Sequence, residues 1–168
     1  MSPENGEPSE AAEAVRDKQT SAGGELRPTT DSTASHEATP NAPFVFVVDD
    51  EASICNFVAK TLNSLGVECE AFHTAKSALA GLARRSPSVI LLDVALMQSD
   101  AIDVVHGLGD LHYDGVVHLM SGGNPSLVEA VQRIGARKRV VFGRPLHKPF
   151  RREALLTLFS EIGLAKSS

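Results

Sequence analysis

Five polar residues stand close behind apolar runs, where a chain commonly turns out of a buried strand. They are Asp49 and Asp50, Asp93, Ser121 and Lys148. Carboxylates are the ligands that hard divalent cations such as Mg²⁺ prefer. A hydroxyl and an ammonium group suit the oxygens of a phosphoryl group. If the fold brings these side chains together, they predict an aspartate that accepts a phosphoryl group beside a bound cation.

The elements that must position these residues are short apolar runs. The strongest are residues 44–48 (FVFVV), 89–93 (VILLD), 116–120 (VVHLM) and 139–142 (RVVF). The run at 89–93 is continuously apolar up to its aspartate, which is typical of a central strand covered on both faces. A further stretch, 67–72 (VECEAF), alternates apolar and polar residues, which indicates an edge strand.

Helical signals separate these strands. Ser53 and Thr74 are candidate N-caps, and Pro125 suits the first turn of a helix. We therefore expect helices over residues 53–65, 75–85, 101–111, 125–135 and 151–162. Five strands alternating with five helices predict an α/β fold, a doubly wound five-stranded parallel sheet with right-handed crossovers. Such sheets bind ligands beyond the carboxyl ends of their strands, where all the polar residues above lie.

Composition and charge divide the chain into two parts. Residues 1–43 carry eight acidic and three basic residues, a balance that equals the net charge of −5 of all 168 residues. They contain no aromatic residue, so we expect a disordered acidic N-terminal tail, followed by one folded domain over 44–168. The balanced charge of the domain gives no reason to expect nucleic acid as a partner.

No apolar run approaches the roughly 20 residues that cross a bilayer, and the N-terminus lacks a secretory signal. We expect a cytoplasmic protein without a membrane partner. Cys55 and Cys69 lack the spacing of metal ligands and are interpreted as reduced thiols in or near the core. The six histidines are scattered and are interpreted as structural or surface residues.

The ordered set of polar residues resembles the receiver domain of response regulators, the phospho-accepting module of two-component signalling. The signature of that family has an acidic pair after the first strand, an aspartate after the third, a hydroxyl residue after the fourth and Lys-Pro after the fifth. This sequence carries all four parts between residues 44 and 164. The resemblance implies a flavodoxin-like fold with strand order 2-1-3-4-5.

The resemblance also implies roles for individual residues. Asp93 is expected to take a phosphoryl group from a phosphohistidine of a histidine kinase or histidine phosphotransfer protein, forming an acyl phosphate. The Lys148 ammonium and the Ser121 hydroxyl are expected to hold the phosphoryl oxygens.

The implied cofactor is Mg²⁺. Asp50 and Asp93 are expected to bind it directly, Asp49 mainly through a coordinated water, and Ala95 through its backbone carbonyl.

At the level of the whole protein, the resemblance implies a single-domain response regulator, because the sequence ends just after the last predicted helix. We expect it to signal in trans through an unknown output protein or to relay the phosphoryl group. A homodimer through the fourth helix, fifth strand and fifth helix is a further possibility. Enzymatic activity is not expected beyond self-catalysed phosphotransfer and autodephosphorylation.

The sequence departs from the family pattern at two places. In the loop after Asp93, Met97 and Ala101 stand where the family has Pro and Gly, so a different course of this loop is expected. Pro145 replaces the aromatic residue that usually reports phosphorylation by rotating. We expect the loop over residues 121–124 to carry the change instead, with Phe142 as a fallback if its ring lies beside Ser121.

Two other classes of function stay open as alternatives. Phosphatases of the haloacid dehalogenase type use an Asp-x-Asp motif, but Asp93 is followed by Val94 and Ala95. A receiver-like module that binds a protein without being phosphorylated is the remaining alternative. Phosphate transfer with and without Mg²⁺ separates these classes.

Overall fold

The computed structural model describes residues 43–96 and 100–164, and the predicted tail lies outside them except for its last residue. The elements follow in the order β1 (Phe44–Val48), α1 (Ala52–Asn63), β2 (Glu68–Phe72), α2 (Ala75–Leu82), β3 (Val89–Asp93), α3 (Asp100–Asp110), β4 (Val116–Ser121), α4 (Pro125–Arg137), β5 (Val141–Phe142), β6 (Leu146–His147) and α5 (Arg152–Glu161).

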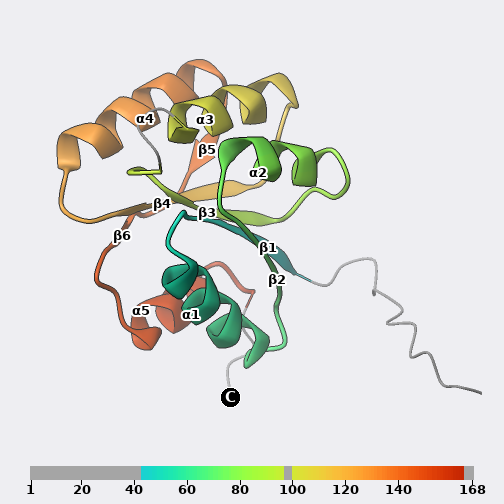
Figure 1. Ribbon diagram of the computed structural model, residues 1–168, viewed down its shortest axis with the longest axis vertical. Helices are drawn as coiled ribbons and strands as arrows, with labels where there is room; N and C mark the ends of the chain where they lie inside the picture. The colour runs from blue at the N-terminus through green and yellow to red at the C-terminus, as the bar shows by residue number, and fades with distance from the viewer. Residues whose placement is uncertain (1–42, 97–99, 165–168) are drawn as a thin grey trace, which may run out of the picture. The chain divides into compact units, whose positions relative to one another are not determined.

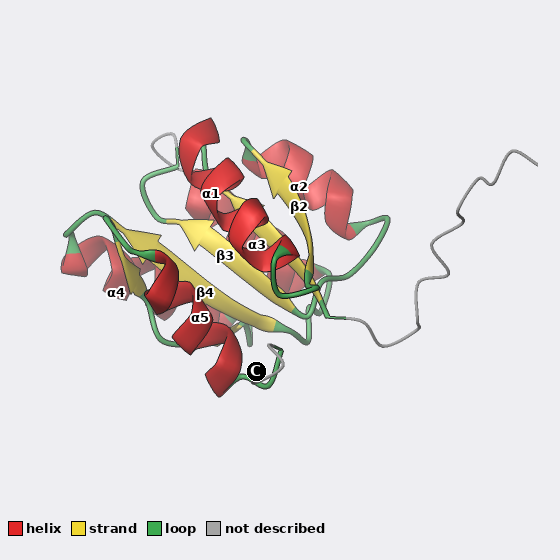
Figure 2. Ribbon diagram, turned by 90° about the horizontal axis from the view of Figure 1, so that it is seen from below, coloured by secondary structure: helices red, strands yellow, loops and turns green. Residues whose placement is uncertain are grey.

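The strands form one twisted sheet (Figure 2) in the order β2-β1-β3-β4-β5, with β6 also paired to β4. Every pairing is parallel. Helices α2, α3 and α4 cover one face of the sheet, and α1 and α5 cover the other (Figure 1). The predicted α/β fold and the strand order 2-1-3-4-5 are therefore confirmed.

A separate apolar core fills each face of the sheet, because successive side chains of a strand point to opposite sides. In β1, Phe46 and Val48 pack into the core beneath α2, α3 and α4, whereas Val45 and Val47 pack into the core beneath α1 and α5. Strand β3 is buried along its whole length. The central strands thus hold their carboxyl ends rigidly, which is what a site at those ends requires.

The helix starts agree only in part with the sequence. Thr74 caps α2 as predicted, because its hydroxyl accepts a hydrogen bond from the Ser77 amide at 3.1 Å. The predicted N-cap Ser53 is wrong. Helix α1 starts at Ala52 after Glu51, which makes no side-chain cap. The amide of Glu51 instead donates to Asp49 Oδ1 at 3.0 Å, so the strand-end aspartate fixes the entry into this helix.

The fifth strand is the second correction. The sequence predicts one strand over residues 139–142, but the structure forms two short ones, β5 and β6. Arg139 has a left-handed backbone, with φ of 63°, and lies outside the strand. Pro145 stands between the two pieces, and the His118 ring on β4 donates from Nδ1 to the Arg144 carbonyl at 2.8 Å. The fourth helix also runs to Arg137, beyond the predicted end near residue 135.

None of the helices within residues 43–96 and 100–164 combines the length and the apolar character needed to cross a membrane.

Candidate functional site

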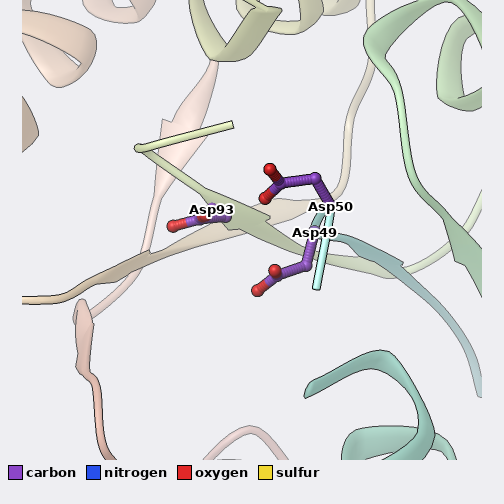
Figure 3. A group of neighbouring side chains, drawn as sticks. All are labelled: Asp49, Asp50 and Asp93. Atoms are coloured by element: carbon purple, nitrogen blue, oxygen red, sulfur yellow. The ribbon is translucent and has the colours of Figure 1, made fainter. Parts of the chain in front are cut away.

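Three carboxylates meet where β1 and β3 end. Asp49 and Asp50 directly follow β1, and Asp93 is the last residue of β3. Each of them places a carboxylate oxygen within 4.8 Å of the others. Figure 3 shows the three side chains projecting into the same region beyond the strand ends. The sequence prediction that these residues come together is thereby met by their geometry.

The side chain of Lys148, the residue directly after β6, places its ammonium group among these carboxylates. Its Nζ lies 2.7 Å from Asp49 Oδ2 and 3.2 Å from Asp93 Oδ2. The Glu51 carboxylate is more distant, at 4.0 Å. The Asp49 side chain has no exposed surface and that of Asp93 only 4%, so both pairs act in a medium where charges interact more strongly than in water.

The two buried carboxylates are held in the same way. One oxygen of each faces the Lys148 ammonium, and the other accepts a backbone amide. Asp49 Oδ1 accepts from Glu51 at 3.0 Å, and Asp93 Oδ1 accepts from Ala95 at 3.2 Å. Asp50 differs, because it is exposed and no hydrogen bond or ion pair holds its carboxylate within the described part of the chain.

Burial and neighbouring charges shift the pKa values of Asp93 and Lys148. Burial raises the pKa of Asp93 above its ordinary value, although the Ala95 amide and the Lys148 charge act in the opposite direction. Burial by itself lowers the pKa of Lys148, but Asp49 and Asp93 outweigh it, so the net pKa is raised. Lys148 is therefore charged at neutral pH. Asp93 is a more basic oxygen nucleophile than a solvated aspartate.

Ser121 lies at the same edge of the sheet. In the register of β3 with β4, Asp93 pairs with Met120, and Ser121 is the next residue. Its hydroxyl is buried and accepts from the amides of Gly123 and Asn124, both at a long 3.4 Å. Since those contacts use only its lone pairs, the hydroxyl proton remains available to donate.

The loop after Asp93 is described only in part. Residues 97–99, with the predicted effect of Met97, lie outside the described residues. Ala101 is buried within α3, near its start. Ala95 contacts Asp93 through its amide, and the expected role of its carbonyl as a metal ligand stays a prediction.

Phe142 does not lie beside Ser121, so the fallback switch residue is wrong. Phe142 pairs with Val117, at the other end of β4, and its ring packs where a side chain of Gly135 would stand. His147 is the residue that pairs with Ser121. Phe142 precedes His147 by five residues along the chain, so its place is near the start of β4 and not beside Ser121.

Two residues of this region were missed by the sequence analysis. The carbonyl oxygen of Asp49 accepts from His73 Nδ1 at 2.9 Å and from the Cys55 thiol at 3.3 Å. From the sequence alone, Cys55 is interpreted as a reduced thiol in or near the core and His73 as a structural or surface residue. Their contact joins α1 and the end of β2 to the backbone of Asp49, and neither residue stands at a recognisable motif spacing. Only the fold reveals it.

The sequence of the chain is similar to those of known proteins. The family model described as "Response regulator receiver domain" matches residues 45–160. The luminescence regulatory protein LuxO of Vibrio campbellii is 31% identical over 88 residues, which cover 51% of this chain and 19% of LuxO. The transcriptional regulatory protein TdiR of Thauera aromatica is 28% identical over 119 residues, covering 70% of this chain and 50% of TdiR. The chain thus spans half or less of these relatives.

Solved structures show the same fold. The receiver domain of NtrX from Brucella abortus is 30% identical, with a TM-score of 0.60, over 73% of this chain and 99% of that domain. A response regulator from Colwellia psychrerythraea has a TM-score of 0.62 at 21% identity, over 73% of this chain and 97% of that one.

Proposed function

The chain belongs to the family of response regulator receiver domains, and we propose that it accepts a phosphoryl group on Asp93 in a reaction that depends on Mg²⁺. The donor is a phosphohistidine of a histidine kinase or a histidine phosphotransfer protein. The observation that carries the proposal is the position of Lys148, whose ammonium group lies 3.2 Å from Asp93 Oδ2 while it also contacts Asp49.

The donor set fits Mg²⁺. Three carboxylates with oxygens within 4.8 Å of one another provide hard oxygen ligands, and one of them, Asp50, is exposed and open to a cation that keeps several waters. Asp50 and Asp93 would hold the cation directly, with Asp49 and the Ala95 carbonyl in support. When bound, the cation neutralises the carboxylates and draws charge from the phosphoryl oxygens.

The chemistry of transfer then falls to Asp93. One of its carboxylate oxygens attacks phosphorus, and the bond from phosphorus to the histidine nitrogen breaks, with its electron pair returning to the imidazole. Burial raises the pKa of Asp93 in the absence of a cation, and a cation held by this carboxylate would keep it ionised for the attack. Lys148 shifts from the carboxylate to a phosphoryl oxygen, and the Ser121 hydroxyl donates its free proton to another.

The proposal is tested by incubating the protein with a small phosphodonor, with and without Mg²⁺. We expect one phosphate per chain, stable in acid and labile in base, formed only with Mg²⁺. Asp93→Asn should abolish it. Asp103→Asn, an exposed aspartate on α3, serves as the matched control and should leave it intact. Phosphorylation of Asp93→Asn at the wild-type rate would overturn the assignment and favour the binding-module alternative.

A further inference from the structure

The backbone carbonyl of Asp49 is bound by two side chains from different elements. His73, just past the end of β2, donates from Nδ1 at 2.9 Å, and Cys55 on α1 donates from its thiol at 3.3 Å. The two donor atoms are 3.8 Å apart. Because the acceptor is a carbonyl, His73 must carry its proton on Nδ1. Both lone pairs of the oxygen are thereby used.

This carbonyl belongs to the peptide that joins Asp49 to Asp50. Since a peptide unit is planar, fixing its oxygen also fixes the amide and the Cα position of Asp50, so that only rotation about φ and the side-chain torsions remains to direct the Asp50 carboxylate. The Asp50 carboxylate has no hydrogen bond or ion pair of its own among the described residues. Its place beside Asp93 therefore depends on the backbone that carries it.

Asp49 provides the contrast within the same loop. Its side chain is held by the Glu51 amide at 3.0 Å and by Lys148 at 2.7 Å, so its carboxylate has direct anchors. Loss of the contacts to the Asp49 carbonyl would thus affect Asp50 more than Asp49.

We propose that His73 and Cys55 are positioning residues that orient Asp50 for cation binding through the Asp49–Asp50 peptide. The proposal rests on the Mg²⁺ site of the proposed function. Neither side chain is among the carboxylates that would hold the cation. Cys55 is buried and His73 is exposed, so the two contacts reach the carbonyl from the core and from the surface. Residues that support metal ligands in this way commonly change metal affinity about tenfold or more when removed.

The test is calorimetric titration of the full chain with Mg²⁺ alone. We expect His73→Ala and Cys55→Ala each to raise the Mg²⁺ dissociation constant by about tenfold. His73→Asn keeps an amide donor near the position of Nδ1, and Cys55→Ser keeps a hydrogen-bond donor. Both should stay within about threefold of the wild-type constant, the scale of one modest hydrogen bond.

Cys69→Ala is the matched control. Cys69 is a half-buried thiol on β2, paired with Val45 at the opposite end of the strand from His73. Its replacement can lower the melting temperature but should leave the Mg²⁺ constant unchanged. Phosphorylation by a small donor gives a second readout. In His73→Ala the Mg²⁺ concentration for half-maximal rate should rise, while the rate at saturating Mg²⁺ stays near that of the wild type.

The outcomes separate the two proposals. If the wild type binds Mg²⁺ and His73→Ala binds it equally well, the positioning role is overturned and the proposed function stands. If the wild type binds no Mg²⁺, both fail. Should Cys55→Ala not fold, the exposed His73 decides the matter, because its replacement leaves the core intact.

Discussion

The Lys148 ammonium lies 2.7 Å from Asp49 Oδ2, and the Asp49 side chain is fully shielded from solvent while Lys148 keeps 13% of its side-chain surface exposed. Apart from Lys148, no described group donates a hydrogen bond to this oxygen. The Asp49 carboxylate is out of contact with solvent, so among the described groups only the Lys148 ammonium stabilises its Oδ2 oxygen. The ion pair therefore links the end of β1 to the end of β6 across the sheet edge.

Replacing Lys148 by an uncharged residue should destabilise the protein. In Lys148→Met we expect the free energy of unfolding to fall by about 3 kcal/mol, because the buried Asp49 and Asp93 charges lose their partner. Denaturant unfolding without Mg²⁺ measures the loss. Lys138→Met removes another lysine that also contacts a carboxylate, Asp110 at 2.9 Å, but on the surface, and should have no measurable effect. Equal losses in the two variants would contradict this view of the site.

Two helix ends carry side chains where the backbone favours glycine. His112 after α3 has φ of 53°, and Arg139 after α4 has φ of 63°. Arg139→Gly should therefore raise the free energy of unfolding by about 0.5–1 kcal/mol. His112→Gly should raise it less, because the ring bonds the Asp110 carbonyl at 3.1 Å. Ala136→Gly, within α4, should lower it by about 1 kcal/mol. Thermal unfolding distinguishes these signs.

His118 predicts a pH dependence of stability. Its ring is buried, Nδ1 donates to the Arg144 carbonyl, and Nε2 has no partner among the described residues. Burial lowers its pKa from the ordinary 6.5, although the bond to Arg144 raises it in part and Glu161 also favours the charged form. Just below pH 6.5, His118 therefore binds a proton in the unfolded chain but stays neutral in the folded protein.

Stability from this group is therefore complete above pH 6.5 and is lost as the pH falls from there toward the folded-state pKa. The limiting slope is about 1.4 kcal/mol per pH unit. Urea unfolding of the wild type and His118→Asn at pH 7.5 and 5.5 should show a smaller pH effect in the variant. His106→Asn, on the exposed side of α3, should keep the wild-type pH effect. An unchanged slope in His118→Asn would rule out this role.

The residues at the strand ends could be predicted because each follows a run of apolar residues. Such runs, and the turn residues after them, can be recognised within a short segment of sequence. Asp93 and Ser121 needed only their strands to be recognised. The strand order came from the family resemblance. The errors arise where tertiary contacts override local preference. Ser53 is a residue type that often caps helices. Helix α1 nevertheless begins one residue before it, at Ala52, where the Asp49 carboxylate binds the amide of Glu51 at the helix entry.

Other features had no local signal at all. Arg139 adopts a left-handed backbone that its residue type disfavours, so the sequence wrongly predicted it as part of a strand. His73 and Cys55 meet at the Asp49 carbonyl only because β2 lies beside β1 and α1 packs next to both. Contacts of this kind depend on the register of the sheet, which no single segment of sequence determines.

The last prediction concerns the change that follows phosphorylation. The loop after Ser121 has room to move, because a side chain at Gly122 or Gly123 would meet no other atom within 4 Å. Gly123 has φ of 112°, which glycine adopts without strain. The loop is tied to Ser121 only by two long contacts of 3.4 Å to its hydroxyl, and Asn124 then caps α4. If the hydroxyl turns toward a phosphoryl group, these contacts change together and the start of α4 follows.

Beryllofluoride with Mg²⁺ should therefore alter hydrogen exchange across residues 121–134 in the wild type and not in Asp93→Asn. Phe142→Ala should show the same difference as the wild type, since its ring packs at Gly135 and pairs at the level of Val117, far along β4 from the loop. A bistable segment must respond to the ligand that biases it. Unchanged protection across this segment, with changes elsewhere, would therefore place the switch in another part of the domain.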